Sequence, residues 1–230
     1  MLARPISIAL ETTCSQGGVA LGAGAVLAAV LPFDAARRAA TQVVARLEEL
    51  LRQAELRPPD VNEIYVSCGP GSYTGTRVGV TTARTLAQAI GCTRCVGVPT
   101  VQAIAQNVPP APEIENLAVV LDARHGMVYA ARFQPRGGHW AQVSPGQTQP
   151  PEALLAEAPR PLHVVGEGLG YCHVEGADVL PLDRALWLPR AEGVWAVGRR
   201  MAMAGAFIDL MQLRPIYTGL PEAVRKWDNR

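Results

Sequence analysis

A turn rich in glycine and proline runs directly into an amphipathic helical pattern at residues 69–87, GPGSYTGTRVGVTTARTLA. The apolar segment before it, residues 63–68, has the pattern of a buried strand. Gly69, Pro70 and Gly71 favour a tight turn, and Ser72 or Thr74 can cap the helix. A strand, a turn and a helix in this order predict an α/β fold, in which helices cover a sheet.

The same turn also has features of a phosphate site. Bare backbone N–H groups and the positive end of a helix dipole attract anions. A nucleotide-hydrolysing loop further needs a lysine for the outer phosphates and a Ser or Thr for magnesium, whereas Arg77 follows Gly75-Thr76 here. Lys226 is the only lysine of the chain. A structural turn is favoured, and a phosphate cradle stays open as the alternative.

Regular patterns fill the first half of the chain. The runs ISIAL, GGVAL and AVLAAVL predict three strands, and a helix is expected from about Asp34 to just before Pro58. Strands are then expected at residues 63–68 and 94–98, and helices at residues 72–90 and 100–106. Three strands followed by alternating helices and strands predict a mixed sheet covered by helices.

Residues 107–113, NVPPAPE, interrupt this pattern and indicate a boundary. Beyond them, residues 117–133 repeat the design of the opening segment: an apolar run that ends in an acid, a turn, and a second apolar run. The two acids are Glu11 and Asp122. We therefore expect two halves of related design, residues 1–106 and 107–230. The second half is more irregular, with a strand at 162–166 and a helix at about 192–205.

Composition excludes several classes of protein. A chain of 230 residues that is 49% hydrophobic can bury a substantial core. Its net charge of +1 gives no overall attraction to nucleic acid or to an anionic membrane. The apolar stretch at residues 18–33 is shorter than the roughly 20 residues of a membrane span, and the opening residues lack a signal-peptide pattern. Five scattered cysteines suit reduced thiols, so we expect a cytoplasmic protein.

Cys92-x-x-Cys95 is the one cysteine motif. A zinc ribbon would need a second such pair, and a thioredoxin-type site usually opens a helix, whereas this pair leads into the apolar run RCVGV. A structural role is therefore favoured over chemistry.

The two early helices each have an apolar and a polar face when successive residues are placed about 100° apart. The expected core faces consist of Val43, Val44, Leu47, Leu50, Leu51 and Ala54 in the first helix, and of Gly79, Ala83, Leu86, Ala87 and Ile90 in the second. The opposite faces present Arg38, Thr41, Ala45, Glu48 and Arg52, and Arg77, Thr81, Arg84 and Gln88 with Val80 at the edge. Arginine is enriched at protein interfaces, so a partner surface and plain solvent exposure both stay open.

The sequence offers little for catalysis. Its histidines, at positions 125, 139, 163 and 173, never fall at i, i+4, and its serines lack the G-x-S-x-G setting of a nucleophile elbow. We expect neither metal nor cofactor. Glu11 and Asp122 stand at strand ends, where sheet enzymes place catalytic acids and magnesium ligands, but where turn-forming acids are also common. The alternative function is an ATP-dependent phosphotransferase that uses Glu11. A metalloprotease is disfavoured, because the sequence has no histidines at metal-ligand spacing.

The segment GPGSYTGTRVGVTTARTLA closely resembles the GPGSFTGLRIGxxxAKGLA signature of the bacterial TsaB (YeaZ) family of tRNA threonylcarbamoyladenosine biosynthesis proteins. The match is supported in register by ISIALETTCSQGGVAL, by GVPTVQAIA and by LDARHGMVYAARF, so it covers about residues 5–133. Three departures occur. The opening acid is Glu11 rather than Asp, the first helix begins near Ala39-Ala40-Thr41-Gln42 rather than a His-Ser-Glu, and Thr218-Gly219 follows Tyr217 in place of Leu-Arg.

The resemblance implies two actin/Hsp70/sugar-kinase-like halves and a non-catalytic accessory subunit. It implies pairing with the larger paralogue TsaD, together with the ATPase TsaE, in threonylcarbamoyl transfer to N6 of adenosine 37 in tRNAs that read ANN codons. Contact with tRNA would then be indirect, and the isolated protein would form homodimers. The family's pairing surface lies on its two N-terminal helices, which corresponds here to Arg38, Thr41, Ala45, Arg77, Val80, Thr81, Arg84 and Gln88. Vestigial nucleotide-site positions would be Glu11, Thr12, Thr13, Gly69, Gly71 and Ser72.

Overall fold

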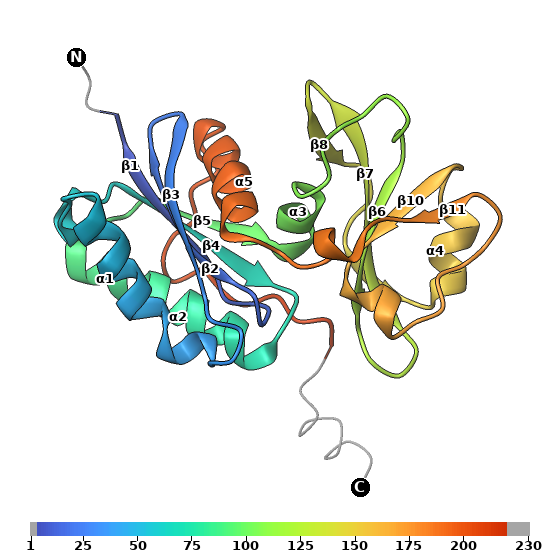
Figure 1. Cartoon of the computed structure of the whole chain (residues 1–230), viewed down its shortest axis with the longest axis horizontal. Coiled ribbons are helices and arrows are strands. Elements are labelled where there is room, and N and C mark those ends of the chain that lie inside the picture. The colour runs from blue at the N-terminus through green and yellow to red at the C-terminus, as the bar shows by residue number, and fades with distance from the viewer. Residues whose placement is uncertain (1–3, 220–230) are drawn as a thin grey trace, which may run out of the picture. The chain divides into compact units, whose positions relative to one another are not determined.

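The computed structural model describes residues 4–219, which form two compact units (Figure 1). The first consists of residues 4–109 with Ala185–Ile216, and the second of residues 110–184 with 217–219. The first unit contains β1 (Ile6–Glu11), β2 (Gly18–Ala23), β3 (Val26–Pro32), α1 (Val43–Gln53), β4 (Glu63–Gly69), α2 (Tyr73–Ile90), β5 (Cys95–Pro99), α3 (Thr100–Ala105) and α5 (Ala191–Met203). The second contains β6 (Leu117–Asp122), β7 (Val128–Arg136), β8 (His139–Gln142), β9 (Gln147–Gln149), α4 (Pro151–Glu157), β10 (Leu162–Val165) and β11 (Val179–Pro181).

The first unit is built on a mixed sheet with the strand order β3-β2-β1-β4-β5. Strands β1 to β3 are antiparallel neighbours, whereas β4 lies parallel to β1 and β5 parallel to β4. Helices α1 and α2 pack on one face and α5 on the other (Figure 1). Because side chains alternate along a strand, Ile8 and Leu10 of β1 enter the core under α1 and α2, and Ala9 enters the core under α5.

Helix α5 packs very closely on the sheet because small residues lie at the contact. A Cβ on Gly22 would overlap the Trp195 ring, and a Cβ on Gly198 would overlap the Tyr65 ring. The indole Nε1 of Trp195 also donates a 3.0 Å hydrogen bond to Ser7 Oγ. The helix expected at residues 192–205 is confirmed, but it lies in the first unit rather than with the second half to which the sequence assigned it.

The second unit repeats the plan of the first. Its sheet has the order β11-β10-β6-β7-β8, and β9 also pairs with β7. Strand β6 is antiparallel to β7 and parallel to β10, as β1 is to β2 and β4. Leu154 of α4 joins the core of this sheet. The fold class is confirmed: an α/β chain of two related units, each with a mixed sheet and helices. The chain passes between the units at Pro109 and Pro110, within the proline-rich interruption.

Most predicted elements of the first unit are confirmed to within a few residues. The first helix is the exception, because it begins at Val43 rather than near Asp34. Gln42 holds the intervening turn: its side-chain oxygen accepts from Asp34 N at 2.8 Å, and its nitrogen donates to Asp34 O at 3.0 Å. A short 3-10 helix, η1 (Ala39–Thr41), lies between. Within residues 4–219, no helix is both long and apolar enough to cross a membrane.

Candidate functional site

Glu11 lies at the end of β1 with its carboxyl group fully buried. One carboxyl oxygen, Oε1, accepts hydrogen bonds from Thr13 N and, at 2.6 Å, from Thr13 Oγ1. The other oxygen, Oε2, has no hydrogen-bond partner among the described residues. Burial raises the pKa of Glu11 above its ordinary value of 4.5, and the bonds from Thr13 lower it by less. Burial therefore makes ionisation of this carboxyl group less favourable than that of an exposed one.

The turn before α2 closes directly over the end of β1. Ser72 N donates to Thr13 O at 2.7 Å, and Thr12 Oγ1 donates to Gly75 O at 2.8 Å. Ser72 is the N-cap that the sequence predicts, because its Oγ accepts from Gly75 N at 3.2 Å. The glycines are needed for this approach: a Cβ on Gly71 would press on Thr13, and one on Gly75 would overlap the Thr12 carbonyl.

Because of these contacts, the side chains expected to form a nucleotide site are not available to a ligand. Thr12 and Thr13, which would have to face a ligand, are buried and hydrogen-bonded to the turn itself. A magnesium–phosphate group needs an accessible carboxylate, whereas Glu11 is fully buried and burial disfavours its charged form. The expected positions are thus brought together, and their arrangement serves to fasten β1 to α2.

A chain of buried hydroxyl groups continues inward from this turn. Ser67 Oγ and Thr100 Oγ1 are 2.9 Å apart, and Thr100 Oγ1 lies 3.5 Å from Thr13 Oγ1. Sequence patterns did not single out Thr100 as part of this site. Its position as the first residue after β5 was the only available signal, since parallel neighbouring strands end at the same sheet edge.

Asp122, the matching acid of the second unit, has a local structural role. It ends β6, and its Oδ1 accepts from Arg124 N at 2.8 Å. Arg124, His125 and Gly126 all have positive φ values, of 65°, 55° and 74°. The carboxylate therefore stabilises a tight hairpin turn, which is one of the two roles open to a strand-end acid.

The outer face of η1, α1 and α2 contains most of the residues expected to meet a partner. Arg38, Thr41 and Ala45 are exposed, as are Arg77, Thr81 and Gln88 on α2. The 3-10 helix η1 packs beside α2, so these residues belong to neighbouring parts of one face. Arg84 is half-buried, and its guanidinium lies 3.5 Å from the Met211 sulfur.

Val80 does not belong to this face, contrary to the sequence prediction. Its side chain is only 3% exposed and packs in the core between α2 and the sheet. Val44 shows the opposite error, since it was assigned to the core and is 65% exposed. Helical spacing gave the relative angles of these residues correctly, but the width of the buried stripe depends on neighbouring elements.

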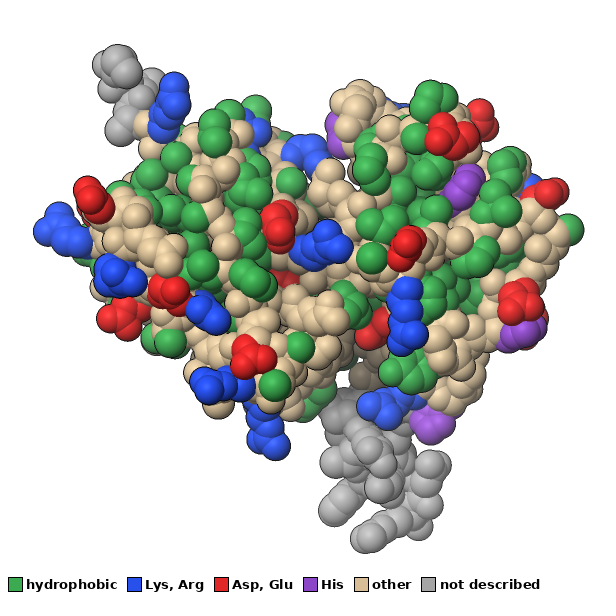
Figure 2. All heavy atoms as spheres, in the orientation of Figure 1, with side chains coloured by type: hydrophobic (Ala, Val, Ile, Leu, Met, Phe, Trp, Pro, Cys, Tyr) green, Lys and Arg blue, Asp and Glu red, His purple; other side chains and the backbone are tan. Residues whose placement is uncertain are grey.

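The outer face of η1, α1 and α2 presents several arginines. Arg38, Arg77 and Arg84 form no ion pair within residues 4–219, although Arg77 lies over the Tyr73 ring at 5.5 Å from its centroid. In the view of Figure 2, basic and acidic side chains are interspersed, and no continuous basic surface of the kind that binds nucleic acid is visible.

Several known proteins are similar to this chain. The family profile described as "TsaD: tRNA N6-adenosine threonylcarbamoyltransferase" matches residues 27–171. A Bacillus subtilis relative named tRNA threonylcarbamoyladenosine biosynthesis protein TsaB is 30% identical over 190 residues, which covers 79% of this chain and 80% of the relative. The Escherichia coli protein of the same name is 26% identical and covers 91% and 93%.

A solved structure, YeaZ from Pseudomonas aeruginosa, is similar to the chain in fold. Its TM-score is 0.77 at 24% sequence identity, over 93% of this chain and 99% of that one. The similarity extends over both units and so supports the two-unit architecture as a whole.

Proposed function

We propose that this chain, which belongs to the TsaB (YeaZ) family of tRNA threonylcarbamoyladenosine biosynthesis proteins, is a non-catalytic accessory subunit that pairs with TsaD. Family membership places it in the biosynthesis of threonylcarbamoyladenosine in tRNA. In the proposed complex, with TsaE, TsaD transfers the threonylcarbamoyl group to N6 of adenosine 37 in tRNAs that read ANN codons. The chain acts in the cytoplasm, touches tRNA only through the complex, and forms a homodimer when alone.

The closed turn that begins at Gly69 is the observation that supports a non-catalytic, accessory role. A catalytic subunit of this fold would use the end of β1 and the start of α2 to hold its ligand. Here the Thr13 carbonyl and the Thr12 hydroxyl bond to that turn, and Glu11 is buried beneath them. The histidines of the sequence also never fall at the i, i+4 spacing of a helical metal site.

The outer face of η1, α1 and α2 supports the pairing role. Arg77, which forms no ion pair within residues 4–219, lies over the exposed Tyr73 ring at the start of α2, and Val44 on α1 is also exposed. Apolar contact with charged groups at its border is typical of a specific interface. We therefore expect the partner to present a helix face with apolar residues and carboxylates.

Reconstitution of tRNA modification tests the accessory role. TsaC, TsaD and TsaE are combined with tRNA with and without this chain, and modified adenosine is quantified by mass spectrometry. Strong dependence on the chain is expected. Equal modification in its absence would contradict the proposal.

Calorimetry with Mg-ATP tests the phosphotransferase alternative. We expect no binding tighter than about 100 μM, which corresponds to roughly 5.5 kcal/mol. Tighter binding that Glu11→Ala abolishes would favour the phosphotransferase instead.

A further inference from the structure

The segment from Phe207 to Ile216, which we call the strap, follows α5 and belongs to the first unit. Gly205, just after the end of α5, has a φ of 76°, and the chain then reaches β5, the outermost strand of the sheet. Ile208 N donates to Cys95 O at 2.9 Å, so the strap begins as an antiparallel bridge to β5. The strap thus covers part of this edge of the sheet.

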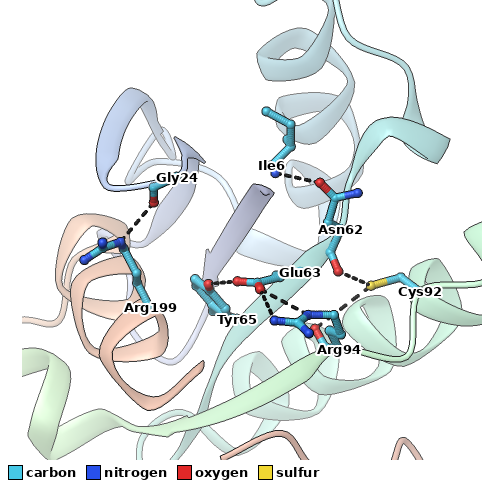
Figure 3. A network of polar contacts seen from close by, with 8 residues as sticks. All are labelled: Ile6, Gly24, Asn62, Glu63, Tyr65, Cys92, Arg94 and Arg199. Carbon is cyan, nitrogen blue, oxygen red and sulfur yellow. Dashed lines mark hydrogen bonds and ion pairs between the residues drawn. The ribbon is translucent and has the colours of Figure 1, made fainter. Parts of the chain in front are cut away.

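Stacking and a network of polar contacts fix the beginning of the strap. The Arg94 guanidinium lies over the Phe207 ring, with its carbon 4.2 Å from the ring centroid. Arg94 is held in turn by Glu63, whose Oε1 lies 2.7 Å from Arg94 Nη2. The Tyr65 hydroxyl donates to Glu63 Oε2 and so fixes this carboxylate from its other side (Figure 3). The start of the strap is therefore tied to side chains of β4 and of the loop before β5.

Leu213 anchors the middle of the strap in the core. Asp209 first turns the chain: its carbonyl oxygen accepts from Leu213 N at 3.1 Å, and its Oδ1 accepts from Met211 N at 2.7 Å. Leu213 is only 1% exposed and packs among the core residues under α1 and α2. It lies directly against Gly97 of β5, because a Cβ on that glycine would come within 3.1 Å of Leu213 Cδ1. The strap is therefore part of the first unit's core and does not lie loosely on its surface.

The end of the strap meets the turn that starts α2. Ile216 N donates to Cys68 O at 2.6 Å, one residue before the end of β4. The next residue is Gly69, where a Cβ would overlap the Ile216 carbonyl oxygen. From Gly69 the turn continues to Ser72, whose N–H is bonded to Thr13 O. Ile216 therefore lies against the first residue of the turn that closes over β1.

A further contact joins the strap to the helix itself. Arg84 Nη2 lies 3.5 Å from Met211 Sδ, so the strap also touches α2 near its middle. Tyr73 and Arg77 lie in sequence between this contact and the contact at Gly69, and both are exposed on the outer face. The part of α2 that the proposed partner would meet is thus held by the strap at both of its ends.

We propose that the strap positions the start of α2 for the partner, through the hydrogen bond from Ile216 N to Cys68 O. This inference rests on the proposed pairing with TsaD. A helix start that is already held in place presents Tyr73 and Arg77 without the entropy cost of ordering them on binding. Without the bond, the turn opens more often, and the population of the position that fits the partner falls. Ile216 is then a positioning residue and makes no contact with the partner itself.

Amide hydrogen exchange in the folded, full-length protein, followed by NMR, tests the positioning. Ile216→Pro removes the N–H that donates to Cys68 O. The N–H groups of Ser72 and Thr76, which are bonded to Thr13 O and Ser72 O, report on the turn and the start of α2. They should exchange roughly five- to tenfold faster in Ile216→Pro, as expected for the loss of one backbone hydrogen bond. The control Ile216→Ala keeps the N–H and shortens the side chain, so both amides should exchange nearly as in the wild-type protein.

The distribution of the effect separates positioning from general stability. Amides of β2 and β3, at the opposite edge of the sheet, should keep their wild-type exchange rates in Ile216→Pro. Equally faster exchange there, or unchanged exchange at Ser72 and Thr76, would overturn the proposal. If Ile216→Pro does not fold, Leu213→Ala removes most of the buried side chain that anchors the strap. It should speed exchange in the turn more than in β2 and β3, and an equal rise in both places would contradict the positioning role.

Binding to TsaD, measured by surface plasmon resonance, tests the link to the partner. The affinity of Ile216→Pro should fall about threefold, because the position that fits the partner becomes one of a few, and that of Ile216→Ala should stay near wild type. A loosened turn with unchanged affinity would overturn the proposal. Failure of the wild-type chain to bind TsaD would contradict the proposed function instead, and the exchange rates would still decide whether the strap positions α2.

Discussion

Glu11 contributes to stability in a way that depends on pH, because its folded-state pKa lies above the ordinary 4.5. A group whose pKa rises on folding adds stability that is fully present below the unfolded pKa and is lost as the pH rises through the folded pKa. Acidic conditions, down to about pH 4.5, should thus favour the closed β1–α2 turn.

Replacement of this carboxyl by a neutral isostere should remove the effect. Relative to wild type, Glu11→Gln should gain in free energy of unfolding as the pH rises, by about 1.4 kcal/mol for each unit by which folding raises the pKa. Urea unfolding across a pH series measures the difference. Glu48→Gln, which alters an exposed carboxylate on α1, should run parallel to wild type. A pH-independent gap for Glu11→Gln would mean that folding does not change the pKa of this carboxyl.

Val80 and Val44 form a matched pair for the corrected helix faces. Val80→Ala should lower the free energy of unfolding by about 2 kcal/mol, since it deletes buried methyl groups and leaves a cavity. Val44→Ala, at an exposed position, should change it by no more than about 0.5 kcal/mol. Chemical denaturation of both variants checks this. Equal costs would contradict the faces seen in the structure.

The close contact between α2 and the end of β1 sets the second helix in place. Helix propensity alone predicts that Gly75→Ala stabilises α2 by about 1 kcal/mol. A Cβ at this position overlaps the Thr12 carbonyl, which is backbone and cannot turn aside, so we expect a net loss of stability. Thermal unfolding decides the sign. The control Thr81→Ala, exposed on the same helix, should gain slightly; a gain in both variants would show that the turn can open freely.

Sequence patterns predicted the elements of the first unit because its strands are apolar and its α2 has clear ends, with Ser72 at one and Gly91 at the other. The start of α1 was predicted too early in the chain. The Gln42 side chain forms hydrogen bonds with the Asp34 backbone that hold residues 34–42 in a turn, and hydrophobic periodicity does not reveal such bonds. In the second unit, β8, β9, α4 and β11 were not predicted. They are short, and Gly, Pro and Gln within or beside them weaken both helical and strand periodicity.

At the scale of the whole molecule, the sequence predicted the two related units but not the path of the chain. Residues 185–216 return to the first unit, where α5 covers one face of its sheet. The pattern of α5 shows which of its faces is apolar and contains no information about the sheet that receives it. The closed state of the Glu11 site was hidden for the same reason, since it depends on contacts between Thr12 and Gly75 that are distant in sequence.

The outer face of η1, α1 and α2 leads to a prediction about assembly. Arg77→Glu should weaken association with TsaD by about tenfold, or about 1.4 kcal/mol, because a carboxylate would then oppose the acidic groups expected on the partner. The melting temperature should change little, since Arg77 is exposed, forms no ion pair within residues 4–219, and contacts a Tyr73 ring that is itself exposed.

Surface plasmon resonance at two salt concentrations measures this loss, and added salt should narrow it by screening. Arg136→Glu makes the same charge reversal on an exposed residue of the second unit and should bind TsaD as wild type does. Equal weakening in both variants would indicate a general effect of net charge. Unchanged binding by Arg77→Glu would show that the pairing surface does not include this part of α2. The accessory role would still stand if tRNA modification continued to depend on the presence of the chain.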